Sequence, residues 1–252
     1  MEEHINQAAQ WLASARKVIA LTGAGVSTES GIPDFRSPGG LWTRYNPAEY
    51  GTLGAFLRDP EKVWTMLAEF EALLDARPNA GHIALAGLEE AGVLAGIITQ
   101  NIDGLHQSAG NKQVVEYHGS NRTYSCLSCR SRLPREQVVP LGIPPRCPQT
   151  ANGHRCGNIL KPDVVFFDEN IPPQALIGAD QLVRGADLIL VLGTSCEVYP
   201  AAGIPDQVRR QGGKVVEVNL EQAADLMPDL SLQGKFSEIL PALSARLETL
   251  RS

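Results

Sequence analysis

Several kinds of feature are scarce in this chain, and each scarcity excludes a class of protein. Its 252 residues contain no run of eighteen apolar residues, so we expect no membrane-spanning helix. Lysine and arginine total 22 against 28 acidic residues, which gives a net charge of −6. Because a nucleic-acid backbone binds to a basic face, we expect no nucleic-acid partner. The first residues lack the basic start and apolar core of a secretion signal, so a cytoplasmic protein is the default expectation.

Cysteine is also scarce, and its distribution is uneven. Four of the five cysteines lie within one stretch, as Cys126-x2-Cys129 followed by Cys147-x8-Cys156. In a reducing compartment such crowding favours a metal site over disulfides. Two thiolates on one turn can bind the same tetrahedral Zn²⁺ and a second pair completes the site, with His154 as an alternative to Cys156 for the fourth ligand. A site with four protein ligands leaves no position for water, so we interpret the zinc ion as structural.

The most informative segment follows the first apolar run. Residues 18–21 are typical of a buried strand, and they lead into Gly23-Ala24-Gly25-Val26-Ser27. Two glycines one residue apart allow a sharp turn and a close approach of the backbone to a ligand. A helix beginning near Ser27 would direct its amide groups at an anion. The segment therefore predicts a phosphate or dinucleotide site, with a tight turn that binds nothing as the alternative.

This segment departs from the fingerprint of dinucleotide-binding dehydrogenases. That fingerprint places a third glycine three residues after the second, followed by a helix and a second strand. Here the next glycine is Gly31, and Pro33 pushes Ile32 out of the helical region. Residues 37–40 have the composition of a loop, where the fingerprint requires regular structure. We therefore do not expect hydride transfer.

Apolar periodicity predicts the remaining elements. Apolar residues at helical spacing mark the helices, and short apolar runs that end in polar residues mark the strands. The predicted helices cover residues 2–15, 60–76 and 79–90, and the predicted strands cover 18–21, 94–99, 114–117, 188–192 and 215–218. Because helical patterns separate most of these strands, the predicted fold class is α/β, with a doubly wound parallel sheet.

Polar side chains follow these strands at the points where they end. The carboxyl ends of parallel strands meet at one edge of a sheet, and ligands bind there. The polar segments are residues 22–25, 100–103, 118–120 and 193–195, together with Asn219. Their convergence predicts a single site at this edge.

Taken with the cysteine pairs, these segments resemble the sirtuin family of NAD-dependent protein lysine deacylases. The resemblance includes Gly31-Ile32-Pro33-Asp34-Phe35-Arg36 and Lys161-Pro162-Asp163-Val164-Val165-Phe166-Phe167, and it covers nearly the whole chain in order. It implies a Rossmann-like NAD-binding domain and a second, smaller zinc-binding domain formed by two insertions. The implied large domain comprises residues 1–36, 76–121 and 161–252, and the implied small domain comprises a helical part, 37–75, and a zinc module, 122–160.

The resemblance places NAD between the two domains. Its diphosphate is expected over the glycine segment, its adenosine half beside Thr194, Ser195 and Asn219, and its nicotinamide ribose beside residues 100–103. The implied cofactor-binding residues are Gly23, Ala24, Gly25, Ser27, Thr28, Asp34, Phe35, Arg36, Gln100, Asn101, Ile102, Asp103, Gly193, Thr194, Ser195, Asn219, Leu220 and Phe236.

The same resemblance implies catalytic roles for His118, Asn101 and Asp103. The acyl oxygen of the substrate attacks the ribose carbon as nicotinamide leaves, and Asn101 and Asp103 supply an oriented dipole and a charge near that centre. His118 acts as general base on a ribose hydroxyl, a task that suits an imidazole with a pKa of about 6.5. The expected products are free lysine, nicotinamide and an acylated ADP-ribose. Taken singly, the three could be a structural histidine, a turn residue and a helix cap.

The implied protein substrate binds as a strand between edges from both domains. The implied substrate-binding residues are Val164, Val165, Phe166, Phe167, Val198 and Tyr199, although either phenylalanine could equally belong to the core. Family members that prefer acidic acyl groups carry a Tyr-x-x-Arg pair on the small-domain helix, and residues 63–70, the nearest segment, lack it. We therefore expect an apolar acyl pocket that favours acetyl or longer apolar acyl groups over succinyl. Its candidate lining residues are Trp64, Met66, Leu67 and Phe70.

Two other functions stay open on the same residues. NAD cleavage could pass ADP-ribose to a protein or to water, which would make the chain an ADP-ribosyltransferase or a NAD hydrolase. A NAD-sensing module without turnover is the other alternative, against which the presence of His118 argues. We expect a monomer with acylated-lysine proteins or peptides as partners and no membrane partner.

Overall fold

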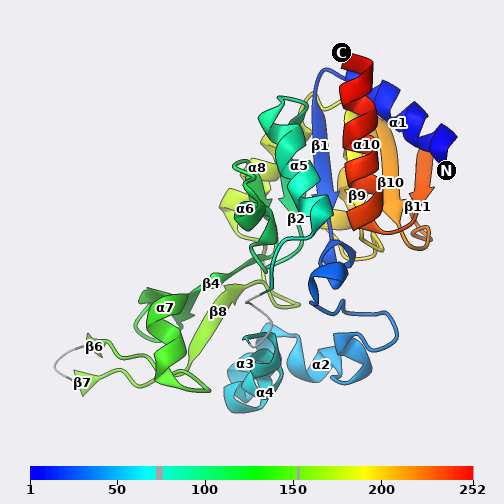
Figure 1. The fold of residues 1–252 in the computed structure, drawn as a ribbon. Coiled ribbons are helices and arrows are strands. Elements are labelled where there is room, and N and C mark those ends of the chain that lie inside the picture. The colour runs from blue at the N-terminus through cyan, green and yellow to red at the C-terminus, as the bar shows by residue number, and fades with distance from the viewer. Residues whose placement is uncertain (72–75, 152–153, 252) are drawn as a thin grey trace.

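The chain is built around one parallel sheet, with a smaller part beside the carboxyl ends of its strands (Figure 1). A computed structural model of the protein describes residues 1–71, 76–151 and 154–251. Six strands form the main sheet in the order β11-β10-β9-β1-β2-β3, and every neighbouring pair is parallel. This order confirms the predicted doubly wound α/β fold. The strands are β1 (Val18–Thr22), β2 (Leu94–Thr99), β3 (Val114–Glu116), β9 (Leu188–Leu192), β10 (Lys214–Asn219) and β11 (Leu230–Gln233).

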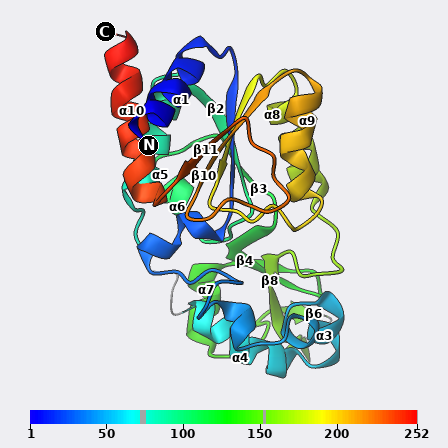
Figure 2. The same ribbon diagram turned by 90° about the vertical axis from the view of Figure 1, so that its right-hand side faces the viewer.

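Helices cover both faces of this sheet, so its strands are apolar on both sides. On β1, Val18 and Ala20 pack into the core on one face, and Ile19 and Leu21 pack into the core on the other. Figure 2 shows the sheet between these two helical layers. The first layer contains α1 (Glu2–Ser14), α5 (Ala80–Glu90) and α10 (Phe236–Arg251), and the second contains α8 (Pro173–Val183) and α9 (Ile204–Arg210).

The smaller part has a separate core that joins two distant stretches of the chain. Trp64 stacks on Tyr124 with ring centroids 6.2 Å apart, and its indole N–H donates to the Leu160 carbonyl at 3.0 Å. A three-stranded antiparallel sheet, β5-β4-β8, supports this core. Its elements are α2 (Pro47–Tyr50), α3 (Leu53–Arg58), α4 (Pro60–Glu71), β4 (Gly119–Cys126), β5 (Arg132–Pro134), α7 (Arg135–Val138), β6 (Thr150–Ala151), β7 (His154–Arg155) and β8 (Leu160–Val164).

The structure also corrects the expected helix near Ser27. Two short 3₁₀ turns, Ala24–Val26 and Thr28–Ser30, stand in its place, and Gly31 ends the second with φ of 90°. The Ser27 hydroxyl bonds to Asp103 across the loop, and Ser27 accepts from Ile32, so the segment folds back before a helix can propagate. Three further 3₁₀ turns are Leu41–Thr43, Val139–Leu141 and Ala201–Gly203, and a short helix, α6, spans Leu105–Ala109.

Other predicted elements lie close to their observed positions. Asn79 caps α5 as expected, because its side chain accepts from the amides of Gly81 and His82. The helix predicted over 60–76 corresponds to α4, and the last residues of that prediction lie outside the described part of the chain. Within the described residues, no helix combines the length and the apolar character needed to cross a bilayer. The predicted domain boundaries stay a prediction.

Candidate active site

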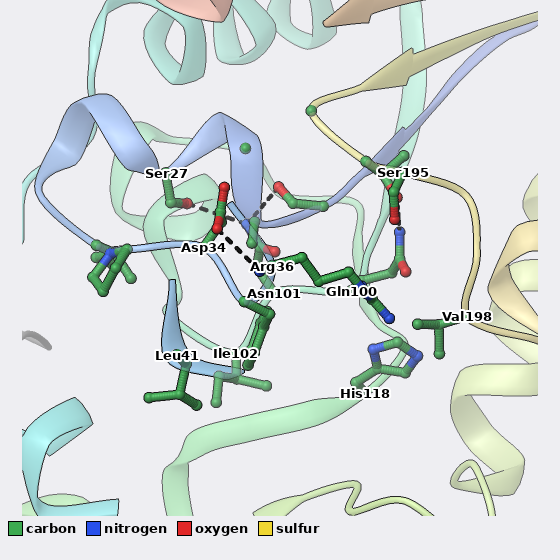
Figure 3. A pocket seen from close by; sticks show the side chains of 18 of the residues that line it. Ser27, Asp34, Arg36, Leu41, Gln100, Asn101, Ile102, His118, Ser195 and Val198 are labelled. Atoms are coloured by element: carbon green, nitrogen blue, oxygen red, sulfur yellow. Dashed lines mark hydrogen bonds between the residues drawn. The ribbon is translucent and has the colours of Figure 1, made fainter. Parts of the chain in front are cut away.

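The carboxyl ends of the sheet strands open into a cavity of about 900 Å³. The residues inferred to bind NAD, to catalyse the reaction or to contact the peptide strand all line this one cavity. Figure 3 shows its side chains arriving from the glycine segment, from the 100–103 turn after β2, from His118 and from the segment after β9. Convergence at one sheet edge is therefore observed, while the individual roles stay predictions.

The two glycines of the first loop are required by the packing of the loop itself. A Cβ on Gly23 would lie 2.6 Å from the Thr194 Cβ, and a Cβ on Gly25 would lie 2.8 Å from the Gly193 carbonyl oxygen. The Gly25 amide also donates to that carbonyl at 2.9 Å. The sequence argument invoked approach to a ligand, whereas the structure adds a close contact between two loops. Gly193, Thr194 and Ser195 form the second of these loops, and all three line the cavity. The contact therefore holds the two loops together at the cavity wall.

A buried hydrogen-bond network joins the glycine segment to the turn after β2. The Ser27 hydroxyl donates to Asp103 Oδ2 at 2.7 Å and accepts from Asn101 Nδ2 at 3.1 Å. Asn101 Nδ2 also donates to the Gly23 carbonyl at 3.1 Å. Burial raises the pKa of Asp103, while hydrogen bonds from Leu105 and Ser27 oppose that rise. The network fixes an amide and a carboxylate where they can act on positive charge that develops in the cavity.

His118 follows β3 and is positioned from two sides. Its carbonyl accepts from the Val165 amide at 2.8 Å, which ties it to the predicted substrate segment. Burial lowers the pKa of His118, and a hydrogen bond with the main chain of Gln100 opposes that shift. The side chain of Gln100 is itself held by Thr194 Oγ1 at 2.9 Å. A partly buried imidazole that is neutral at neutral pH can accept a proton, as a general base must.

The lowered pKa of His118 predicts how activity depends on pH. A base works only when deprotonated, so kcat/KM, which reports the ionisation of the free enzyme, should fall as pH drops through the pKa of His118. Because burial lowers that pKa, the acid limb should lie below about pH 6.5, the value for an exposed imidazole. Initial rates at peptide concentrations well below KM, in buffers of constant ionic strength, measure this limb. A limb centred above pH 7 would contradict the assignment.

The two other buried histidines have structural roles. His106 accepts or donates a hydrogen bond with Thr22 Oγ1 at 2.9 Å and lies against His82, with ring centroids 4.9 Å apart. Burial lowers the pKa of His106 to about 3 and that of His82 to about 4. Both are therefore neutral at physiological pH. The interpretation of His106 as structural agrees with this geometry.

Main-chain amides of the predicted substrate segment, residues 164–167, already form hydrogen bonds within the protein. The amides of Val165, Phe166 and Phe167 donate to His118, Glu169 and Gly51 respectively. Phe166 is buried and stacks on Phe56 with centroids 5.6 Å apart, so its core interpretation holds. Phe167 and Tyr199 are 39% and 74% exposed at the cavity rim. Of the predicted substrate-binding residues, Phe167, Tyr199 and Val198 therefore keep exposed surface that a peptide could contact.

Part of the cavity lining is apolar. Trp64, Met66 and Leu67 are buried and line it, as the acyl-pocket prediction required. The side chain of Phe70, the fourth candidate, lies outside the described residues. Sequence reasoning missed Leu41, which is buried beside these residues in a loop with no periodic pattern. It also missed Asn121, Ile171, Glu221 and Lys235, for which the sequence offers no separate signal.

The four clustered cysteines form a group that fits one zinc ion. Their Sγ atoms all lie within 4.8 Å of one another, and the Cys126–Cys156 and Cys129–Cys147 pairs are each 3.6 Å apart. A tetrahedral zinc with Zn–S bonds of about 2.3 Å sets sulfur atoms about 3.8 Å apart. His154 is exposed on β7 and is not part of this group. The four thiols could therefore hold one structural zinc ion.

The chain is similar to known proteins over most of its length. Residues 23–200 match the Sir2 family model. The chain belongs to the Sir2 family. It is 46% identical to NAD-dependent protein deacylase 2 of Pyrobaculum aerophilum, over 93% of this chain and 92% of the relative. It is 44% identical to the NAD-dependent protein deacylase of Pyrococcus furiosus, over 95% and 96%.

Solved Sir2 structures agree with this membership. One, from work on the mechanism and regulation of Sir2 enzymes, covers all of both chains with a TM-score of 0.92 and 39% identity. A Sir2 homologue in complex with NAD covers 98% and 94%, with a TM-score of 0.88 and 42% identity. A Sir2 protein bound to a myristoylated histone peptide covers 100% and 99%, with a TM-score of 0.85 and 35% identity. The sirtuin resemblance and the Rossmann-like fold are thus confirmed.

Proposed function

We propose that this protein removes acetyl or other apolar acyl groups from lysine side chains of proteins, consuming NAD and releasing nicotinamide and an O-acyl-ADP-ribose. The observation that carries the proposal is that the glycine segment, the 100–103 turn, His118 and the 164–167 segment line one cavity. Membership of the Sir2 family supports it, as do relatives named as NAD-dependent deacylases. One Sir2 relative has been solved with a myristoylated histone peptide, which supports an acyl-lysine substrate.

The residues present fit NAD as co-substrate. A cavity of about 900 Å³ is large enough, since ligand sites usually occupy about 300–1,000 Å³. The glycine segment and the Gly193–Ser195 loop offer main-chain groups without bulky side chains at the end nearest Asn219. NAD supplies a ribose carbon that becomes electrophilic when nicotinamide leaves. The residues proposed to hold NAD are the cofactor-binding residues that the sirtuin resemblance implies, of which Gly23 is the first and Phe236 the last in the chain.

The roles of the surrounding residues follow from their contacts. Asn101 and Asp103, both fixed by Ser27, stabilise positive charge on the sugar because their dipole and charge are oriented before the reaction begins. His118, neutral and partly buried, accepts a proton from a sugar hydroxyl. Apolar walls around Trp64 and Leu67 exclude water from the acyl end. Each of these assignments is a proposal that mutagenesis can test.

Mass spectrometry of an acetyl-lysine peptide with and without NAD tests the function directly. The proposal requires NAD-dependent loss of the acetyl group and release of nicotinamide in equal amount. Nicotinamide release that does not depend on the peptide would favour NAD hydrolysis or ADP-ribosyl transfer. Binding of NAD without turnover would favour the sensing module.

Acyl preference is a further prediction. Acetyl and longer apolar acyl groups should be removed at least about tenfold faster than succinyl, because a buried carboxylate without a partner is costly. Leu41, Trp64, Met66 and Leu67 supply no charge at that end. Competition between acetylated and succinylated forms of one peptide measures the ratio of kcat/KM. Leu67→Arg, which adds a cation, should narrow the gap, and comparable wild-type rates on both peptides would contradict the prediction.

Two finer expectations stay predictions. We propose that the protein acts as a monomer in the cytoplasm, as expected from its sequence. Light scattering coupled to gel filtration tests the first point, and fractionation of the source cells tests the second.

A further inference from the structure

Strand β10 carries an acidic residue that is wholly buried. Glu217 is 0% exposed and lies two residues before Asn219, at the end of the strand that opens into the cavity. Val215 on the same strand face, with Ala223 and Leu226 from the loop that follows, belongs to an apolar cluster. An apolar side chain would suit such a position, because burial of a carboxylate is costly. The acid therefore needs a reason beyond packing.

Both carboxylate oxygens of Glu217 are used by neutral donors. Oε1 accepts from the Ala223 amide at 2.7 Å, and Oε2 accepts from the Ser231 hydroxyl at 3.1 Å. Ser231 is the register partner of Glu217 on β11, so the second bond links adjacent strands. In the described part of the chain, no lysine or arginine forms an ion pair with Glu217. Its visible task is thus to hold one backbone amide in the loop after β10.

That amide belongs to a loop that forms one wall of the cavity. Residues 220–224 all line it, next to Asn219, whose side chain is fixed to the Thr194 carbonyl at 3.1 Å. Ala223 and Leu226 are buried, whereas Leu220 at the lip is exposed. The loop is therefore anchored at its middle, and Glu217 supplies the polar part of the anchor. Without it, the Ala223 amide would be buried with no acceptor.

We propose that Glu217 is a positioning residue that sets the depth of the 220–224 loop for the adenosine half of NAD. The inference rests on the proposed function, in which Thr194, Ser195 and Asn219 lie along that half. Because the hydrogen bonds of Glu217 to described residues go to Ala223 and Ser231, and not to His118 or the 100–103 turn, its removal should weaken NAD binding and leave the chemical step intact. The reach of its side chain matters more than its charge, since both donors are neutral.

Four variants separate reach, charge and simple stability. Glu217→Ala and Glu217→Asp should each raise KM for NAD about tenfold, the scale of one lost hydrogen bond, with kcat and KM for acyl peptide within twofold of wild type. Glu217→Gln, which keeps the reach, should stay within about threefold of wild type. Val216→Ala, on the opposite face of β10, is the matched control, and it should lower Tm with no specific change in KM for NAD. Calorimetric titration with NAD gives Kd independently of turnover.

The outcomes are decisive in either direction. Unchanged KM and Kd for NAD in Glu217→Ala would overturn the inference, as would Glu217→Gln behaving like Glu217→Ala. Suppose instead that Glu217→Ala changes all kinetic constants in proportion to its loss of Tm, with no change specific to NAD. Glu217 would then have only a structural role, as Val216 does, and the inference would also be overturned. If Glu217→Ala does not fold, Glu217→Asp against Glu217→Gln carries the same test. Wild-type protein that binds NAD but deacylates nothing would refute the proposed function alone, because the Kd comparison would still decide the role of Glu217.

Discussion

Replacing His118 by alanine should lower kcat for deacylation by about 10²–10⁴-fold, the usual contribution of a general base. The imidazole lines the cavity and has a pKa lowered by burial, a shift that a hydrogen bond with the main chain of Gln100 opposes. Alanine removes the proton acceptor and leaves the Val165-to-His118 main-chain bond in place. Stopped-time mass spectrometry on an acetyl-lysine peptide measures the loss, and NAD titration shows whether binding survives.

A second histidine provides the matched control for this result. His154 is exposed on β7, outside both the cavity and the thiol group. His154→Ala should therefore keep wild-type kcat and wild-type zinc content. If His118→Ala kept more than about a tenth of wild-type kcat while folded, the base would have to be another group.

Loss of one zinc-ligand thiol should strongly destabilise the smaller part of the protein. Cys129→Ser should abolish stoichiometric zinc binding and lower Tm by about 10 °C or more, since loss of a structural metal is among the most destabilising substitutions. Cys126 precedes Cys129 in the sequence and Cys147 follows it. Both are buried in the core that also contains Trp64. That core is expected to loosen when the metal is lost.

Elemental analysis and thermal unfolding of the same samples test this prediction. Wild-type protein should carry one zinc per chain, and a strong chelator should lower its Tm toward that of Cys129→Ser. Cys196→Ser is the control, because Cys196 is a buried thiol outside the group. It should keep its zinc. A fully metallated Cys129→Ser, or wild-type protein without zinc, would refute the structural site.

Much of the fold could be predicted because its signals are local. Continuous apolar runs such as residues 188–192 mark strands buried on both faces, and the polar residues that end them mark the carboxyl edge. Asn79 before an apolar periodic stretch is a helix start that needs no tertiary information. The placement of the site followed from these signals, and the structure brings the predicted residues into one cavity.

Contacts between distant segments account for what could not be predicted. Two 3₁₀ turns replace the expected helix near Ser27, whose hydroxyl bonds Asp103, 76 positions away. Leu41 lies in a loop without periodicity, so only the three-dimensional structure reveals that it lines the cavity. Glu217 lies within the predicted strand 215–218, and the sequence pattern gives no sign that this acid is buried. Its burial depends on an amide contributed by Ala223, which no local rule foresees.

The shared core of the smaller part links the fates of its two insertions. Trp64 comes from the first insertion, while Tyr124 and Leu160 come from the second, more than fifty residues later in the chain. During synthesis the apolar side of α4 stays uncovered until those later residues have been made. A chimaera that exchanges only one insertion with a relative would inherit mismatched halves, so useful grafts should transfer both together.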